Sequence, residues 1–217
     1  MPTFIDRTDA GRQLAAALSE ELEGVDCVVL GLPRGGVPVA AEVAHALGAP
    51  LDVLVVRKVG VPGQPELAMG AVASGDATVR NVDLLGALGI DDAAFERYAD
   101  AQRAEVRSRE QRLRGDRPEV PVADRTVVVV DDGIATGSTM QAALASLRQR
   151  DPARVVVAVP VAPPSACADL EALADEVVCL STPAMFRAVG QWYDDFRQVG
   201  DEEVRSLLAQ ERETGRR

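Results

Sequence analysis

The stretch that most restricts the fold of this chain is TVVVVDDGIATGSTM, residues 126–140. Its four consecutive valines, residues 127–130, predict a strand buried on both faces, because β-branched side chains pack well in a buried sheet. Asp131 and Asp132 follow where that strand should end, and residues 141–147 are typical of a helix. A strand, a short loop and a helix in this order indicate an α/β protein with a parallel sheet, in which ligands bind at the carboxyl ends of the strands.

The loop between this strand and helix has the composition of a phosphate site. Residues 135–139, Ala-Thr-Gly-Ser-Thr, are small and rich in hydroxyl groups, and they open a helix whose first N–H groups can bind an anion. Asp131 and Asp132 can accept hydrogen bonds from sugar hydroxyls or hold a divalent cation. An Asp-Gly turn and a helix cap alone would explain part of the pattern, but the unbroken block is more specific. We therefore predict a sugar-phosphate site.

Composition restricts the classes of function. A chain of 217 residues fits one domain, so we expect a single domain over residues 1–217. The net charge of −11 argues against binding to nucleic acid or to an anionic membrane. The chain has no apolar run of about 18 residues and no signal-peptide pattern, so we expect a cytoplasmic protein. Its three cysteines lack C-x-x-C spacing and are expected to be free thiols.

Strands and helices alternate along most of the chain, as a parallel sheet flanked by helices requires. Strands are predicted at 25–30, 51–56, 126–130, 155–161 and 176–180, and the main helices at 37–47, 91–114, 141–147 and 165–174. Residues 57–80 are rich in Gly and Pro at their start and predict a loop that leads into a β-hairpin. Helix 91–114 carries closely spaced arginines, which could suggest phosphate binding. Its interleaved acids favour a solvated or oligomer-facing surface instead, and we expect a homo-oligomer.

A second glycine-rich turn, GLPRGG at residues 31–36, follows the first predicted strand. Its glycines permit close approach of the backbone to a ligand, and the guanidinium of Arg34 suits phosphate oxygens. Arg57 and Lys58 end the next strand at the same edge of the sheet. Taken alone, the turn is a weak signal, and the two basic residues are equally explained as solubilising charges.

The block VVVVDDGIATGST resembles the phosphoribosyl-pyrophosphate motif of the type I phosphoribosyltransferases. These enzymes transfer ribose 5-phosphate from phosphoribosyl pyrophosphate to a nitrogen base and release pyrophosphate. The resemblance implies their α/β fold, with a small hood built here from roughly residues 1–24 and 181–217. It also implies that Asp131 and Asp132 contact the ribose hydroxyls and Mg²⁺. The implied cradle of the 5′-phosphate consists of Ala135, Thr136, Gly137, Ser138 and Thr139.

The turn that contains Pro33, Arg34 and Gly35 resembles the pyrophosphate loop of the same family. The resemblance implies that Arg34 binds the pyrophosphate and that the peptide bond between Pro33 and Arg34 is cis, as is common in that loop. It also implies that Arg57 and Lys58 reach the pyrophosphate and that the Gly/Pro stretch after them closes over the reaction. Arg34 and Lys58 are therefore expected to act in catalysis.

The sequence does not identify the base that accepts the ribose 5-phosphate. Residues 57–66, RKVGVPGQPE, resemble a segment of adenine phosphoribosyltransferases, and Ala135 stands where hypoxanthine-type enzymes have a proposed proton-accepting Asp. An alanine cannot take a proton, so Glu66 is the candidate for that role. Phe186 and Trp192 lie in a segment that resembles the base-binding end of purine enzymes. Their rings are equally suited to stack on a base or to fill the interior of the hood.

The sequence thus predicts a phosphoribosyltransferase of nucleotide metabolism that uses phosphoribosyl pyrophosphate, Mg²⁺ and an unidentified nitrogen base. A second hypothesis is a regulatory protein that binds phosphoribosyl pyrophosphate and catalyses nothing, which the alanine at position 135 and the unassigned base pocket suggest. A phosphate-binding NTPase is disfavoured because the chain has no G-x-x-x-x-G-K-[ST] motif.

Overall fold

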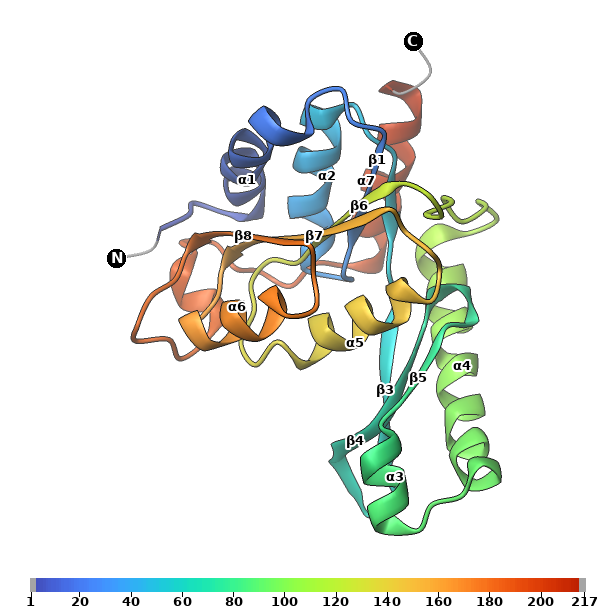
Figure 1. Cartoon of the computed structure of the whole chain (residues 1–217). Coiled ribbons are helices and arrows are strands. Elements are labelled where there is room, and N and C mark those ends of the chain that lie inside the picture. Colours follow the sequence, from blue (N-terminus) through green and yellow to red (C-terminus); the bar gives the residue numbers. More distant parts are fainter. Residues whose placement is uncertain (1–2, 215–217) are drawn as a thin grey trace.

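Five parallel strands form the central sheet of the computed structural model (Figure 1). The structure describes residues 3–214, apart from the side chains of residues 65, 66 and 211–214. The strand order is β2-β1-β6-β7-β8. The strands are β1 (Cys27–Gly31), β2 (Leu51–Val53), β6 (Thr126–Val130), β7 (Arg154–Val161) and β8 (Glu176–Ser181). The predicted parallel sheet flanked by helices is confirmed.

Strands β1 and β6 lie side by side in the middle of the sheet and end together. Their register runs from Cys27 opposite Thr126 to Gly31 opposite Val130, and every residue of both strands is buried. This burial is what the run of valines in β6 predicts. Because the two strands are parallel and end at the same level, the turns that follow them meet at one edge of the sheet.

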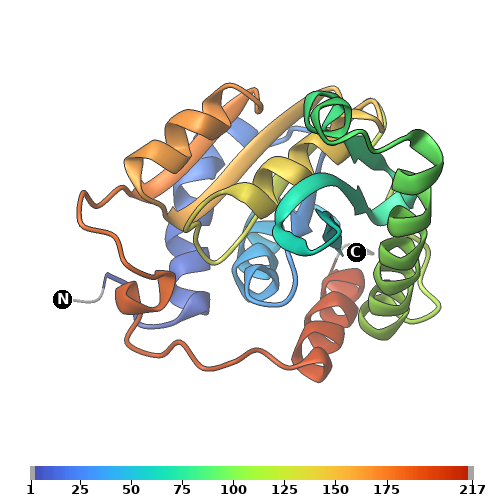
Figure 2. The ribbon, with the colours of Figure 1, turned by 90° about the horizontal axis from the view of Figure 1, so that it is seen from below.

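Helices cover both faces of the central sheet (Figure 1). Val128 and Val130 point into the apolar cluster that includes α1 and α2, whereas Val127 and Val129 point into the cluster that includes α5 and α6. These opposite directions follow from the two-residue period of a strand. Helix α7 packs against α2 (Figure 2). The helices of the core are α1 (Arg7–Leu22), α2 (Gly36–Leu47), α5 (Ser138–Arg148), α6 (Pro164–Glu171) and α7 (Asp201–Thr214).

A second, antiparallel sheet forms an arm that extends away from the central sheet (Figure 1). The arm consists of β3 (Val56–Val61), β4 (Gln64–Ala73), η1 (Ser74–Asp76), β5 (Thr78–Arg80), α3 (Val82–Leu88) and α4 (Asp92–Arg114). The predicted helix at 91–114 is confirmed, with Asp91 as its N-cap. No helix within residues 3–214 is long and apolar enough to span a membrane.

The strand predicted at 51–56 is confirmed at its start but ends at Val53, and the loop predicted directly after it is wrong. The chain leaves the central sheet after Val53, and residues 57–61 belong to β3, which pairs with β4. Val59 and Val61 are buried, so this segment has an apolar side to pack. The register between β3 and β4 shifts on either side of Gly60, and the segment that contains this glycine remains paired with β4. The helix predicted at 141–147 is confirmed but begins earlier, at Ser138.

A buried ion pair joins the arm to the central sheet. The side chain of Asp52 in β2 is 4% exposed, and its carboxylate accepts hydrogen bonds from Arg114 Nε at 2.9 Å and from the Val120 backbone N–H at 2.9 Å. Arg114 is the last residue of α4, and it also pairs with Glu110. Asp52 therefore holds together β2, the end of α4 and the connector that leads to β6.

We expect Asp52→Ala to lower the free energy of unfolding by about 3 kcal/mol, because it removes one partner of a buried ion pair. The control is Arg107→Ala on the same helix, since Arg107 and its partner Asp76 are 64% and 62% exposed. An exposed pair of this kind contributes less than about 1 kcal/mol. Urea unfolding of the two variants measures the difference, and equal losses of stability would contradict the prediction.

Candidate functional site

The turn after β1 packs directly against the two carboxylates after β6. A Cβ atom placed on Gly35 would lie 2.0 Å from Asp132 Oδ2, and one on Gly36 would lie 2.8 Å from Asp131 Cα. Only glycine permits so close an approach at these two positions. The peptide bond between Pro33 and Arg34 is cis, as the resemblance predicts. The structure therefore brings the two motifs into one site.

The two adjacent carboxylates differ in their partners. Asp131 Oδ1 accepts a hydrogen bond from the Asp132 backbone N–H at 2.9 Å. Asp132 Oδ2 accepts one from Arg7 Nε at 2.7 Å, and these two side chains are 13% and 11% exposed. Burial raises the pKa of Asp131 well above its ordinary value, and the neighbouring charge of Asp132 raises it further. Burial also raises the pKa of Asp132, although the charge of Arg7 opposes that rise.

Arg7 is a site residue that sequence reasoning missed. Its guanidinium lies 3.9 Å from the centroid of the Phe196 ring, and its Nη1 donates to the Arg197 carbonyl at 2.8 Å. Tyr193 contacts the main chain of Asp132, since its hydroxyl donates a hydrogen bond to the Asp132 backbone carbonyl at 2.5 Å. An isolated arginine that precedes its partner by 125 residues gives no local signal in the sequence.

The terminal segments meet to form what we call the Arg7 clamp, which consists of Arg7, Tyr193, Phe196 and Arg197 around Asp132. Phe4 pairs with Tyr193 through an isolated parallel bridge, and the backbone N–H groups of Thr3 and Phe4 donate to the Trp192 carbonyl. From there the chain runs along the edge of the molecule to α7 (Figure 2). The assignment of residues 1–24 and 181–217 to a separate hood stays a prediction.

The predicted phosphate cradle is an exposed loop at the beginning of α5. Ala135, Thr136 and Thr139 are exposed, and Gly137 adopts a positive φ of 74° directly before the helix. The hydroxyls of Thr136 and Ser138 lie 3.2 Å apart. The free N–H groups and the dipole of a helix start favour an anion at this position.

Lys58 reaches this cradle from the arm. Its Nζ donates to Ser138 Oγ at 3.0 Å. The ammonium group thus lies beside a hydroxyl predicted to bind the 5′-phosphate, although Lys58 and Ser138 are 80 residues apart in the sequence. Its neighbour Arg57 is an exposed residue of β3.

Basic side chains surround the turn that contains Arg34. Arg34 Nη1 lies 3.5 Å from Asp201 Oδ1 in the first turn of α7. Arg109 of α4 donates from Nη2 to the Pro33 carbonyl at 3.4 Å. Burial lowers the pKa of Arg109, and the nearby positive charges of Arg34 and Arg57 lower it further. The sequence favoured a solvated or oligomer-facing surface for this helix over phosphate binding by its arginines, and their spacing did not single out Arg109.

The two aromatic residues predicted to bind a base stack on each other. The ring centroids of Phe186 and Trp192 are 6.4 Å apart, with an angle of 17° between the planes. Trp192 Nε1 is buried and has no hydrogen-bond partner among the described residues. Both interpretations of these rings stay open. Glu66 lies in β4, but its side chain is outside the described part of the chain.

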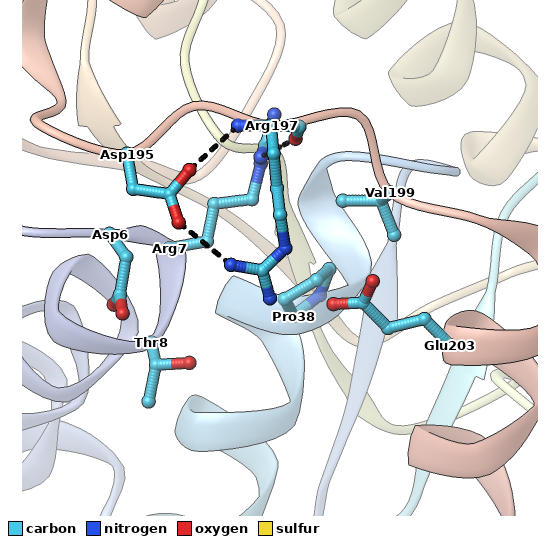
Figure 3. A pocket seen from close by; sticks show the side chains of 8 residues that line it. All are labelled: Asp6, Arg7, Thr8, Pro38, Asp195, Arg197, Val199 and Glu203. Carbon is cyan, nitrogen blue, oxygen red and sulfur yellow. Dashed lines mark hydrogen bonds and ion pairs between the residues drawn. The ribbon is translucent and has the colours of Figure 1, made fainter.

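A small pocket lies behind the Arg7 clamp, between the start of α1, the start of α2 and the segment that leads to α7 (Figure 3). Its lining carries both signs of charge, and none of the sequence-predicted site residues lines it. The Asp195 carboxylate accepts hydrogen bonds from the Arg197 backbone N–H at 3.0 Å and from Arg197 Nη1 at 2.7 Å. The lining residues are Asp6, Arg7, Thr8, Pro38, Asp195, Arg197, Val199 and Glu203.

Comparisons with known proteins agree with the family that the sequence resembles. A sequence model described as the phosphoribosyl transferase domain matches residues 6–197. Two sequences from strains of Mycobacterium tuberculosis, Rv0571c and MT0597, are named provisionally as phosphoribosyl transferases. Each is 51% identical to this chain over 208 residues, which cover 96% of this chain and 47% of the relative. The chain therefore spans about half the length of these relatives.

A solved structure shares both the fold and much of the sequence. The crystal structure of TT1426 from Thermus thermophilus is 51% identical to this chain and superposes with a TM-score of 0.88. The match covers 97% of this chain and 99% of that protein.

We expect Asp131→Asn to raise the free energy of unfolding at pH 7, because burial and the neighbouring charge of Asp132 disfavour the ionised form of Asp131. The raised pKa of Asp131 means that the folded state binds this proton more tightly than the unfolded state does. The stabilising contribution of the Asp131 proton is therefore fully present below the unfolded pKa of 3.8 and is lost as the pH rises through the folded pKa. The asparagine oxygen can still accept from the Asp132 N–H.

Urea unfolding between pH 4 and pH 7 tests this prediction. Asp132→Asn is the matched control, because it leaves the buried Arg7 without its counter-ion and should bring no gain. A variant Asp131→Asn that is less stable than the wild type at pH 7, or that keeps the full pH dependence, would contradict the prediction.

Proposed function

Because the chain belongs to the phosphoribosyl transferase family, whose members are glycosyltransferase-type enzymes, we propose that it transfers ribose 5-phosphate to a nitrogen base. The donor is phosphoribosyl pyrophosphate, and pyrophosphate is released. The contact of Gly35 with the Asp132 carboxylate carries this proposal, since it puts the candidate pyrophosphate loop beside the candidate ribose ligands. A donor that carries a pyrophosphate at C1 and a phosphate at C5 of the ribose suits such a set of loops.

Asp131 and Asp132 are proposed to accept hydrogen bonds from the ribose hydroxyls and to contact Mg²⁺. The residues fit this ion, because Mg²⁺ is commonly held by one or two carboxylates together with phosphate oxygens and water. Among the described side chains, no group of three or more His, Cys, Asp or Glu residues could hold a metal ion. Phosphate oxygens of the substrate and water would complete the shell around Mg²⁺. A bound Mg²⁺ would supply positive charge opposite the pyrophosphate.

The loop from Ala135 to Thr139 is proposed to bind the 5′-phosphate. Two observations support this proposal. The loop leads into the start of α5, and the hydroxyl oxygens of Thr136 and Ser138 lie 3.2 Å apart. The position of Lys58 Nζ, 3.0 Å from Ser138 Oγ, supports a contact with this phosphate. The contact of Lys58 with the pyrophosphate rests on the resemblance alone.

In the proposed reaction, a nitrogen of the base attacks C1 of the ribose while the bond from C1 to the pyrophosphate oxygen breaks. The bonding electrons leave with the pyrophosphate, whose charge Arg34, Arg57 and Lys58 offset. C1 gains oxocarbenium character, which the fixed carboxylates of Asp131 and Asp132 favour. Positioning and charge stabilisation supply most of the rate enhancement.

The proton released by the attacking nitrogen needs an acceptor other than Ala135, and Glu66 is the proposed candidate. Phe186 and Trp192 are proposed to bind the base. The buried indole N–H of Trp192, which has no partner among the described residues, supports this role, because such a donor can bind an acceptor atom on a ligand.

A regulatory protein that binds phosphoribosyl pyrophosphate without catalysis is the second candidate function. Two observations favour it: Ala135 cannot accept a proton, and Arg7 already pairs with Asp132 at 2.7 Å. Both candidates require the same ligand site, so binding and turnover must be measured separately.

For binding, we expect Asp131→Asn combined with Asp132→Asn to weaken Mg²⁺-dependent binding of phosphoribosyl pyrophosphate at least tenfold, about 1.4 kcal/mol. The matched control is Asp83→Asn combined with Asp169→Asn, which removes the same charge from two exposed positions. Calorimetric titration gives both dissociation constants. Unchanged binding in the first variant would remove the proposed ribose and metal site.

For turnover, we expect the wild-type protein to release pyrophosphate when it is given phosphoribosyl pyrophosphate, Mg²⁺ and the correct base from a panel of purines, pyrimidines and nicotinamide. A coupled pyrophosphate assay measures the release, with the double variant at positions 131 and 132 as the background. Tight binding of phosphoribosyl pyrophosphate without release on any base would favour the regulatory candidate instead.

A further inference from the structure

Arg109 differs from other arginines on α4 in what it contacts. Arg103, Arg107 and Arg114 each pair with a carboxylate. Arg109 instead donates from Nη2 to the Pro33 carbonyl, in the turn that also carries Arg34. Its side chain is thus directed from the arm to the candidate pyrophosphate loop.

Much of the hydrogen-bonding capacity of Arg109 remains open. A guanidinium has five N–H donors. In the described part of the chain, the Pro33 carbonyl is the one acceptor that the Arg109 side chain engages, at 3.4 Å. The side chain is half-buried, whereas its neighbours Arg107 and Ser108 are exposed. A partly desolvated guanidinium with open donors is suited to bind an anion.

Positive charge accumulates around Arg109. Its pKa is lowered by burial, by Arg34, by Arg57 and to a smaller extent by Arg112, and the nearby Asp201 raises it. Asp201 also lies 3.5 Å from Arg34 Nη1. Guanidinium groups brought together in this way repel one another, and a polyanion placed among them would offset that repulsion.

We infer that Arg109 is a further pyrophosphate ligand, which acts together with Arg34 and Arg57 and reaches the site from α4. This inference rests on the proposed function, because it names an additional residue of the same donor site. The ligand is the pyrophosphate group of phosphoribosyl pyrophosphate. Asp201 is the carboxylate that this group would compete with for Arg34 and Arg109.

The test uses calorimetric titrations of the full chain with three probes in the presence of MgCl₂: phosphoribosyl pyrophosphate, pyrophosphate and ribose 5-phosphate. We expect Arg109→Ala to weaken binding of the first two at least tenfold, about 1.4 kcal/mol. Binding of ribose 5-phosphate, which lacks the pyrophosphate, should stay the same. Arg107→Ala, two residues away on the same helix, is the matched control and should leave all three affinities unchanged.

Two further variants separate a ligand from a residue that only holds the loop. Arg109→Lys keeps the positive charge and should recover part of the lost affinity, whereas Arg109→Gln should not. Asp201→Asn should tighten pyrophosphate binding by up to about fivefold, since it removes a half-exposed competing charge.

The outcomes distinguish this inference from the proposed function. A wild-type protein that binds none of the three probes would overturn the proposed function and the inference with it. A wild-type protein that binds phosphoribosyl pyrophosphate, together with an Arg109→Ala variant that binds it equally well, would overturn only the inference. Equal weakening for all three probes would show that Arg109 supports the loop and is no pyrophosphate ligand.

Discussion

The contact between the glycine turn after β1 and the two carboxylates after β6 determines how the rest of the site is built. It requires that β1 and β6 are neighbours and end at the same level, which their register provides. It also requires residues without a side chain at positions 35 and 36, where a Cβ atom would overlap Asp132 and the backbone after β6. The central sheet thus supplies the framework, and two glycines allow its two motifs to touch.

This contact has an electrostatic cost, which other parts of the chain reduce. Carboxylates at a crowded strand end are poorly solvated, so the charged form of each is disfavoured. Arg7 offsets part of this cost for Asp132, and the ring of Phe196 and the carbonyl of Arg197 hold its guanidinium in place. From the arm, the guanidinium of Arg109 donates a hydrogen bond to the Pro33 carbonyl. The site therefore depends on segments from both ends of the chain and from the arm.

The sequence predicted those features whose causes are local. A run of valines indicates a buried strand wherever it occurs, and a glycine- or hydroxyl-rich turn after such a strand indicates a phosphate loop. Arg7 and Arg109 could not be found in this way, because their roles arise from partners 125 and 76 residues away. The beginning of the arm was missed for a related reason. Gly60, Pro62 and Gly63 indicate a loop, but pairing with β4 keeps residues 56–61 in a ladder.

The clamp around Arg7 also bears on the order in which the molecule can assemble. Arg7 precedes one of its acceptors, the Arg197 carbonyl, by 190 residues. The arm, by contrast, is closed by hairpin pairings between neighbouring segments. Local contacts form quickly and distant ones slowly, because a long loop must first be closed. The arm can therefore fold while the chain is still emerging from the ribosome, whereas the clamp on Asp132 has to wait until residues 193–197 have been added.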